Sequence, residues 1–82
     1  MNDAAAAQAA VTTLLAARAP DATICPSEAA RLIAGAEGNW REAMPQVHQA
    51  VDAMQRAGSI ALSWKGRPLA ARAGPYRIAR PS

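Results

Sequence analysis

The chain is poor in the residues and segments that disulfide-linked, metal-binding and membrane-spanning proteins require. Its 82 residues include one cysteine, Cys25, and one histidine, His48. One cysteine excludes an internal disulfide framework, and these two residues fall short of the three or four ligands that a zinc site needs. No run of apolar residues is long enough to span a bilayer. We therefore expect neither a bound metal nor a membrane partner.

The chain also lacks an export signal at its start. Residues 1–10 have no basic start and no strong apolar run, so they do not form a secretory signal peptide. The single cysteine fits a reducing compartment. We therefore expect a cytoplasmic protein. Its net charge of +3 is compatible with an anionic partner, although such a modest charge also serves ordinary solubility.

Motifs of catalysis are absent as well. The sequence has no glycine-rich phosphate-binding loop, because Gly35-Ala36-Glu37-Gly38 is typical of a helix connection. It has no nucleophile elbow either. The acids and His48 are scattered over predicted helix surfaces, and a domain of this size has little room for a deep pocket. We expect no catalytic residue, no cofactor and no enzymatic activity.

Acidic residues are absent from residues 59–82, which marks an abrupt change of charge at Gly58. Residues 1–58 carry four arginines against six carboxylates, a net charge of −2. The last segment has a net charge of +5, carried by Lys65, Arg67, Arg72, Arg77 and Arg80. Positive charge concentrated in one short segment favours an anionic partner.

Helical patterns fill the part of the chain before Gly58. Apolar spacing and end signals predict three helices, at about Asp3–Arg18, Pro26–Ala34 and Pro45–Ala57. We expect a single helical turn at Trp40–Ala43 before the third helix, because a proline inside a helix removes a hydrogen bond and costs about 3 kcal/mol. Gly58 is expected to end the third helix in the left-handed conformation.

Strand patterns follow Gly58. Ser59–Trp64 alternates apolar and polar residues as a half-buried strand does, and Lys65-Gly66 is typical of a turn. Tyr76–Ala79 alternates again and is the predicted return strand. Residues 67–75 between them are predicted to form a long connection, and Thr23-Ile24 can add a brief strand to the same sheet.

The order of these elements predicts the fold. Helices followed by a basic hairpin indicate an α+β winged helix-turn-helix, with three helices and a small two- or three-stranded antiparallel sheet. The length fits one domain, which we place over residues 1–82 with residues 1–3 and 81–82 frayed. This fold makes nucleic acid the first partner to consider.

Four short segments follow one another along the chain: Ile24-Cys25-Pro26-Ser27-Glu28-Ala29-Ala30-Arg31, Trp40-Arg41-Glu42-Ala43-Met44-Pro45, Lys65-Gly66-Arg67-Pro68 and Gly74-Pro75-Tyr76-Arg77-Ile78. Taken in this order, they resemble a small bacterial family of unknown function, the one numbered thirty-two fifty-three among the domains of unknown function. The resemblance spans roughly residues 11–80. It implies a winged-helix-like fold and no established reaction, ligand or functional residue.

The third predicted helix is the candidate recognition helix. In helix-turn-helix proteins the exposed face of this helix meets base edges in the major groove. Gln46 and Gln49 point away from the predicted apolar stripe and suit adenine, and Arg56 suits phosphate or guanine. We predict that these residues contact duplex DNA.

The predicted wing supplies the remaining candidate contacts, from Lys65, Arg67 and Arg72 to phosphates. Such contacts give affinity without sequence information. The helix also carries Glu42 and Asp52, however, and strong DNA-binding proteins have a denser basic face. Since a fold does not fix function, the alternative is a protein-interaction module with no nucleic-acid binding, such as a homodimer.

Two residues permit both a structural and a functional interpretation. Trp64 shares its strand face with Ile60 and Leu62, so we predict that it is buried at the core edge rather than exposed for stacking on a base or a partner. Cys25 precedes Pro26 at a helix start, where a thiol can be reactive. We favour a small, partly buried structural residue there.

Overall fold

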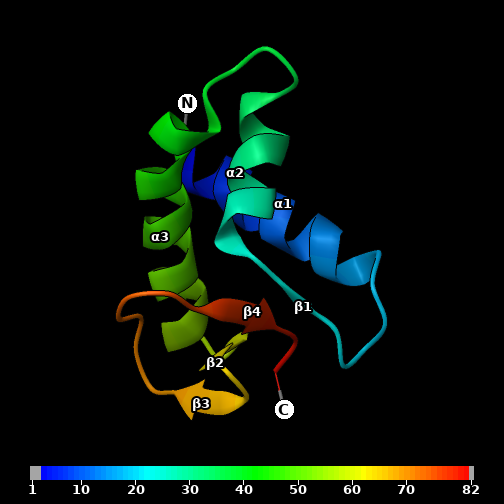
Figure 1. The fold of residues 1–82 in the computed structure, drawn as a ribbon, viewed down its shortest axis with the longest axis vertical. Helices are drawn as coiled ribbons and strands as arrows, with labels where there is room; N and C mark the ends of the chain where they lie inside the picture. The colour runs from blue at the N-terminus through cyan, green and yellow to red at the C-terminus, as the bar shows by residue number, and fades with distance from the viewer. Residues whose placement is uncertain (1–2, 82) are drawn as a thin grey trace.

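The computed structural model describes residues 3–81 and has three helices above one sheet (Figure 1). The elements are α1 (Asp3–Ala16), β1 (Thr23–Ile24), α2 (Pro26–Ala34), α3 (Trp40–Arg56), β2 (Ala61–Trp64), β3 (Arg67–Leu69) and β4 (Arg77–Ala79). The predicted α+β, winged-helix-like fold is confirmed, but the antiparallel sheet has four strands rather than two or three. Of the residues predicted to fray, 1, 2 and 82 lie outside the described residues.

The core lies where the helices meet the sheet. Its largest fully buried side chains are Val11, Ile24, Val47, Val51 and Ile78. Much of the rest is alanine, including Ala10 of α1, Ala29 and Ala30 of α2, and Ala50 of α3. Small side chains let the three helices approach one another closely, which compensates for the modest apolar area that each alanine buries.

The first helix ends two residues earlier than predicted. The backbone N–H of Ala17 is shared between the carbonyls of Thr13 and Leu14, and that of Arg18 bonds to the carbonyl of Leu15, three residues back, at 3.2 Å in each case. Hydrogen bonds to the residue three positions back wind the chain more tightly than the four-residue bonds of an α-helix, so the α-helix ends here. Within residues 3–81, no helix combines the length and apolar character needed to cross a membrane.

The second helix starts where the sequence predicts. Cys25 has an extended backbone at the cap position, and Pro26 is the first helical residue. The Cys25 N–H donates to Glu28 Oε2 at 2.7 Å. Partial burial raises the pKa of Glu28, but this bond and the contact with Arg18 outweigh it, so the pKa lies below its ordinary value. The cap holds Cys25 and Pro26 at a fixed place beside the sheet.

The third helix is longer than predicted, because it begins at Trp40 and continues through Pro45. Asn39 caps it by accepting a first-turn backbone N–H at 3.1 Å, which satisfies one of the donors that a helix start leaves free. Ala43 is buried and Trp40 packs against the core. Capping and burial of this turn offset the hydrogen bond that Pro45 removes. Gly58 ends the helix region with φ +75°, as predicted.

The sheet has the order β1-β4-β2-β3, with every neighbouring pair antiparallel. Lys65 and Gly66 have φ values of 51° and 79°, the left-handed pair that a two-residue hairpin turn requires. This turn joins β2 to β3, so the prediction that residues 67–75 are all connection is wrong for its first three residues. Pro68 is tolerated because β3 is an edge strand, with one side free of ladder hydrogen bonds.

Candidate nucleic-acid interface

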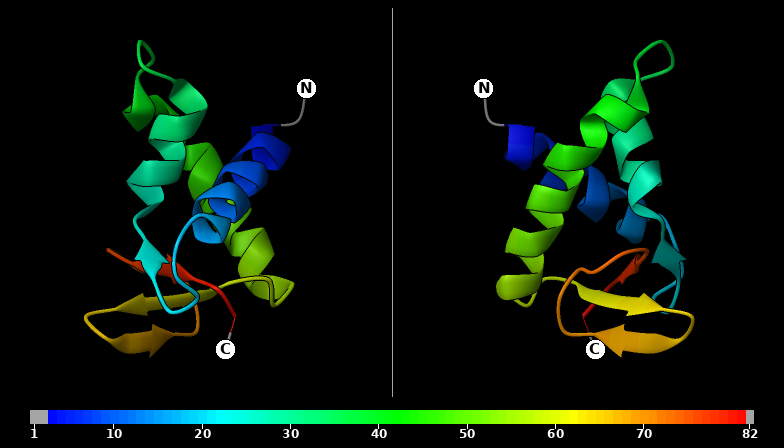
Figure 2. Two further views of the ribbon diagram at one scale, coloured as in Figure 1. Left: turned by 90° about the vertical axis from the view of Figure 1, so that its right-hand side faces the viewer. Right: turned by 60° about the vertical axis from the view of Figure 1, so that its left-hand side comes forward.

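The outward face of α3 carries the three helix residues that the sequence predicts to contact DNA. Gln49 and Arg56 are exposed, whereas Gln46 is half-buried. On the opposite face Val47 and Val51 are fully buried. In the right-hand view of Figure 2, α3 lies toward the viewer and α1 lies behind it. One side of α3 is therefore open along most of its length.

The connection from β3 to β4 is docked along one flank of α3 through three side chains, His48, Asp52 and Gln55. Their spacing of four and three residues places them on one helix face. The Tyr76 hydroxyl lies 2.7 Å from Nδ1 of His48. The Arg72 guanidinium donates to the Asp52 carboxylate at 3.0 and 3.1 Å. The Gln55 side-chain amide donates to the carbonyls of Leu69 and Ala70, at 3.1 and 2.7 Å. The candidate recognition helix and the wing are thus held as one unit.

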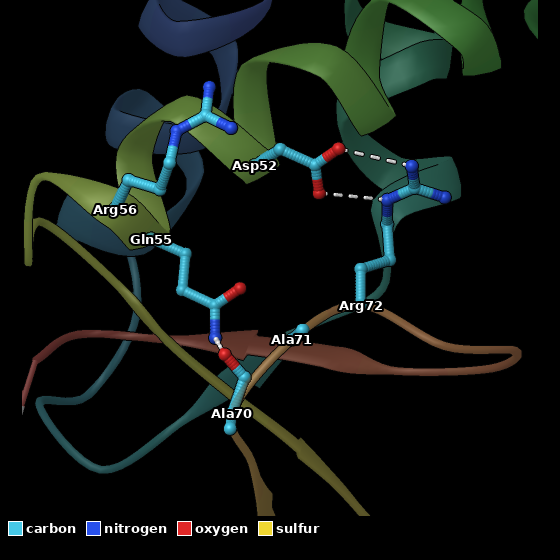
Figure 3. A pocket seen from close by; sticks show the side chains of 6 residues that line it. All are labelled: Asp52, Gln55, Arg56, Ala70, Ala71 and Arg72. Atoms are coloured by element: carbon cyan, nitrogen blue, oxygen red, sulfur yellow. Dashed lines mark hydrogen bonds and ion pairs between the residues drawn. The ribbon is translucent and has the colours of Figure 1, made fainter.

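Arg72 lies within this docked connection and is paired. Its guanidinium makes two hydrogen bonds to the Asp52 carboxylate, beside a hollow of about 400 Å³ between α3 and the connection (Figure 3). The hydrogen bond from Arg72 is the main reason that the pKa of Asp52 lies below its ordinary value, and it raises the pKa of Arg72. The pairing reduces the positive charge that Arg72 offers to a phosphate, so its predicted role as a DNA contact stays a prediction.

Lys65 and Arg67 lie at the tip of the hairpin and are exposed. Among the described residues, neither side chain forms a hydrogen bond or an ion pair. Trp64 stands beside them with 38% of its surface exposed, so the prediction that it is buried is wrong. It shares a strand face with the buried Leu62, but it is the last residue of β2 and adjoins the exposed turn at Lys65 and Gly66, so its surface is only partly covered.

The other two cations after Gly58 hold the fold together. Arg77 donates to the hydroxyl and the carbonyl of Thr23, at 3.0 and 3.2 Å. Arg80 donates to the carbonyls of Leu15 and Arg18, at 2.9 and 3.2 Å, and so satisfies acceptors at the end of α1. The basic stretch read in the sequence therefore divides into structural arginines and free cations at the hairpin tip.

A second hollow, which the sequence did not predict, lies beside Trp64. It has a volume of about 430 Å³, and its walls are mostly apolar. Its lining comes from the start of α2, the first half of α3, the end of β2 and the approach to β4: Cys25, Pro26, Met44, His48, Trp64, Gly74, Pro75, Tyr76 and Arg77. We call it the Trp64 pocket. No local motif reveals it, because its walls come from segments far apart in the chain.

Two titratable side chains of the Trp64 pocket are joined, since His48 Nδ1 lies 2.7 Å from the Tyr76 hydroxyl. Burial lowers the pKa of His48, and the charge of Arg72 lowers it further, against a smaller opposite effect of Asp52. Burial also raises the pKa of Tyr76 to about 12. Both side chains are therefore neutral near pH 7, and the hydrogen bond between them is one between neutral groups.

Cys25 is half-buried in the wall of the Trp64 pocket, and its sulfur accepts a hydrogen bond from the Ser27 hydroxyl at 3.1 Å. This position agrees with the small, partly buried structural residue predicted there. Residues 3–81 hold no group of three or more histidine, cysteine, aspartate or glutamate side chains that is arranged to bind a metal ion. The Trp64 pocket, with its aromatic lining, is one of the hollows of the described residues where a ligand has room.

Comparisons with known proteins give a family but no function. No match is found among curated proteins. The family described as a protein of unknown function, DUF3253, matches residues 4–81, which is nearly the whole chain and agrees with the resemblance noted in its sequence. The chain therefore belongs to the DUF3253 family of proteins of unknown function.

Proposed function

We propose that the protein binds duplex DNA through the open face of α3 and the tip of the β2–β3 hairpin, and that it acts in the cytoplasm by binding rather than by catalysis. The observation that carries this proposal is a set of three exposed cations, Arg56, Lys65 and Arg67. Among the described residues their side chains form no hydrogen bond or ion pair. Cations in this state can replace the counterions of DNA phosphates, which supplies most of the affinity for nucleic acid.

The arrangement of α3 and the hairpin supports the proposal. Both lie toward the viewer in the right-hand view of Figure 2, and the docked connection fixes one relative to the other. Gln49 of α3 is exposed, and an exposed glutamine can reach a base edge. Contacts that are already in position bind with a smaller loss of conformational entropy.

The acidic residues near the open face of α3 limit the affinity for DNA that we expect. Asp52 is neutralised by Arg72 and adds little repulsion toward a phosphate. Glu42, near the start of the helix, is exposed, and its side chain forms no ion pair among the described residues. Three free cations against one free acid predict modest, salt-sensitive affinity with weak preference among sequences.

A titration with two variants tests the proposal. Anisotropy of a labelled blunt duplex is measured at low salt with the natural protein, with Lys65→Gln/Arg67→Gln, and with Arg18→Gln as a control. Arg18 is also an exposed arginine, but it lies two residues beyond the end of α1 and is paired with Glu28. We expect the double variant to bind about tenfold more weakly and the control to change affinity less than about twofold. Absence of binding by the natural protein, or equal losses in both variants, contradicts the proposal.

Self-association is the second candidate function, and one observation favours it. Leu32 of α2 is 50% exposed and borders a shallow hollow of about 290 Å³ that also includes Ala6 and Ala9 of α1. An exposed leucine next to small apolar residues is typical of a helix contact surface. Sedimentation of the natural protein should then show a dimer that Leu32→Glu abolishes. A monomer at high concentration contradicts this candidate.

A further inference from the structure

We propose that the Trp64 pocket receives one unpaired nucleobase of a DNA strand, while Lys65 and Arg67 bind the phosphates beside that base. This inference rests on the proposed function, because it assumes a nucleic-acid partner and adds which structural class of nucleic acid binds best. Duplex binding by α3 needs no unpaired base, so the two claims can fail separately.

The walls of the Trp64 pocket suit a flat aromatic ring. Trp64, His48 and Tyr76 supply three ring systems, and Met44 and Pro75 supply apolar surface. Its volume of about 430 Å³ falls within the range of about 300–1,000 Å³ that is usual for small-molecule sites. Every nucleobase has a π-face, so any of the four bases can stack on such rings.

The hairpin register places a cation beside the indole. Trp64 and Arg67 are direct partners across the β2–β3 pair, and side chains of direct partners lie on the same face of a sheet, about 5 Å apart at their Cβ atoms. Lys65 occupies the turn next to them. An indole flanked by two free cations complements a nucleotide, which joins a π-face to an anionic phosphate.

The polar groups of the pocket can read a base edge. The Tyr76 hydroxyl occupies Nδ1 of His48, and Nε2 of the same ring has no hydrogen-bond partner among the described residues. Arg77 donates from Nε and one terminal nitrogen to Thr23, and its other terminal nitrogen forms no hydrogen bond to the described residues. A neutral imidazole and a guanidinium at an apolar site match the mixed donors and acceptors of a base edge.

An unpaired base fits this site better than a base within a duplex. Base pairs in a duplex cover their ring faces by stacking on their neighbours, so only edges reach a protein. An unpaired base leaves its faces free for aromatic side chains. Exposure of 38% at Trp64 keeps part of the indole available for that contact.

Three labelled probes test the inference: a blunt duplex, the same duplex with one unpaired thymine, and a thymine single strand. They are titrated with the natural protein, with Trp64→Ala, and with Trp40→Phe as a control. Trp40 is the other tryptophan of the chain, and the guanidinium carbons of Arg31 and Arg41 lie over its ring, 4.7 and 4.5 Å from the ring centroid. Circular dichroism confirms that each variant is folded before it is titrated.

We expect the two probes with unpaired thymine to bind more tightly than the blunt duplex. Trp64→Ala should weaken their binding about 5- to 100-fold and change blunt-duplex binding less than about twofold, while Trp40→Phe changes neither. In the Trp40→Phe protein, where Trp64 is the only indole, unpaired thymine should also quench tryptophan fluorescence.

Equal affinity for paired and unpaired probes overturns the inference, and so does an equal loss on all probes with Trp64→Ala. Binding of the unpaired probes without binding of the blunt duplex supports the pocket and contradicts the proposed duplex function. Binding of the blunt duplex alone supports the proposed duplex function and contradicts the pocket. Absence of binding to all three probes rejects both the pocket and the duplex function.

Discussion

At the scale of single residues, the contact between Tyr76 and His48 links the wing to α3. The Tyr76 side chain is buried, with 3% of its surface exposed, and its hydroxyl lies 2.7 Å from Nδ1 of His48. The two rings are tilted, with centroids 5.7 Å apart. This hydrogen bond is the last, in chain order, of the three contacts that dock residues 69–76 onto α3, so it helps to hold the end of the connection against the helix.

Removing the Tyr76 hydroxyl should loosen this end of the connection. Tyr76→Phe keeps the buried ring but loses the hydrogen bond, so we expect the free energy of unfolding to fall by about 1 kcal/mol. Urea unfolding measures this change, and amide exchange should speed up in residues 70–76 before it does in α2. Unchanged stability together with unchanged exchange would show that the bond contributes nothing to docking.

The His48 titration predicts how stability depends on acid. Since burial and Arg72 lower its pKa in the folded protein, the unfolded chain takes up a proton first as the pH falls through the ordinary value of 6.5. The free energy of unfolding is therefore highest above that pH and declines until the pH passes the folded pKa. His48→Gln should flatten the decline. Because the chain has one histidine, an NMR titration of its ring gives the folded pKa directly, and a pKa above 6.5 would refute the account.

At the scale of elements, local end signals and periodicity predicted both ends of α2, and the end of α3 to within one residue. Pro26 and Gly58 define a start and an end because a missing N–H and a left-handed backbone are properties of single residues. Pro45 led to a wrong start for α3, because a single residue shows only the free-energy cost of a proline inside a helix. In the structure this cost is outweighed by the cap and the buried first turn of α3. The short strand β3 has no alternation of its own and exists only through pairing with β2.

The cost of Pro45 should be measurable in α3. Pro45→Ala restores a backbone donor to the helix and removes a clash with the preceding turn, so we expect the free energy of unfolding to rise by about 1–3 kcal/mol. Pro68→Ala on the edge strand is the matched control, with an expected change within about 0.5 kcal/mol. A loss of stability in Pro45→Ala would mean that the helix is shaped around the proline without strain.

At the scale of the whole molecule, the candidate site combines predictable and unpredictable parts. Periodicity placed Gln49 and Arg56 on the open face of α3, and turn chemistry placed Lys65 at a hairpin tip. The partner of Arg72 could not be predicted, because Asp52 is 20 residues away in the chain. The Trp64 pocket depends on contacts of the same kind, such as the His48–Tyr76 pair across 28 residues. The docking of residues 69–76 onto α3, rather than any local motif, creates both the Asp52–Arg72 pair and the Trp64 pocket.

The salt dependence of duplex binding tests the central claim most directly, because it counts the cations that contact phosphate. Three free cations predict that log affinity falls with log salt concentration with a slope of about −2.7, since each contact contributes about −0.9. In Lys65→Gln/Arg67→Gln the slope should shrink to about −0.9. A slope that is the same in both proteins, or no detectable binding at low salt, would contradict the assignment of the hairpin and α3 as a DNA-binding surface.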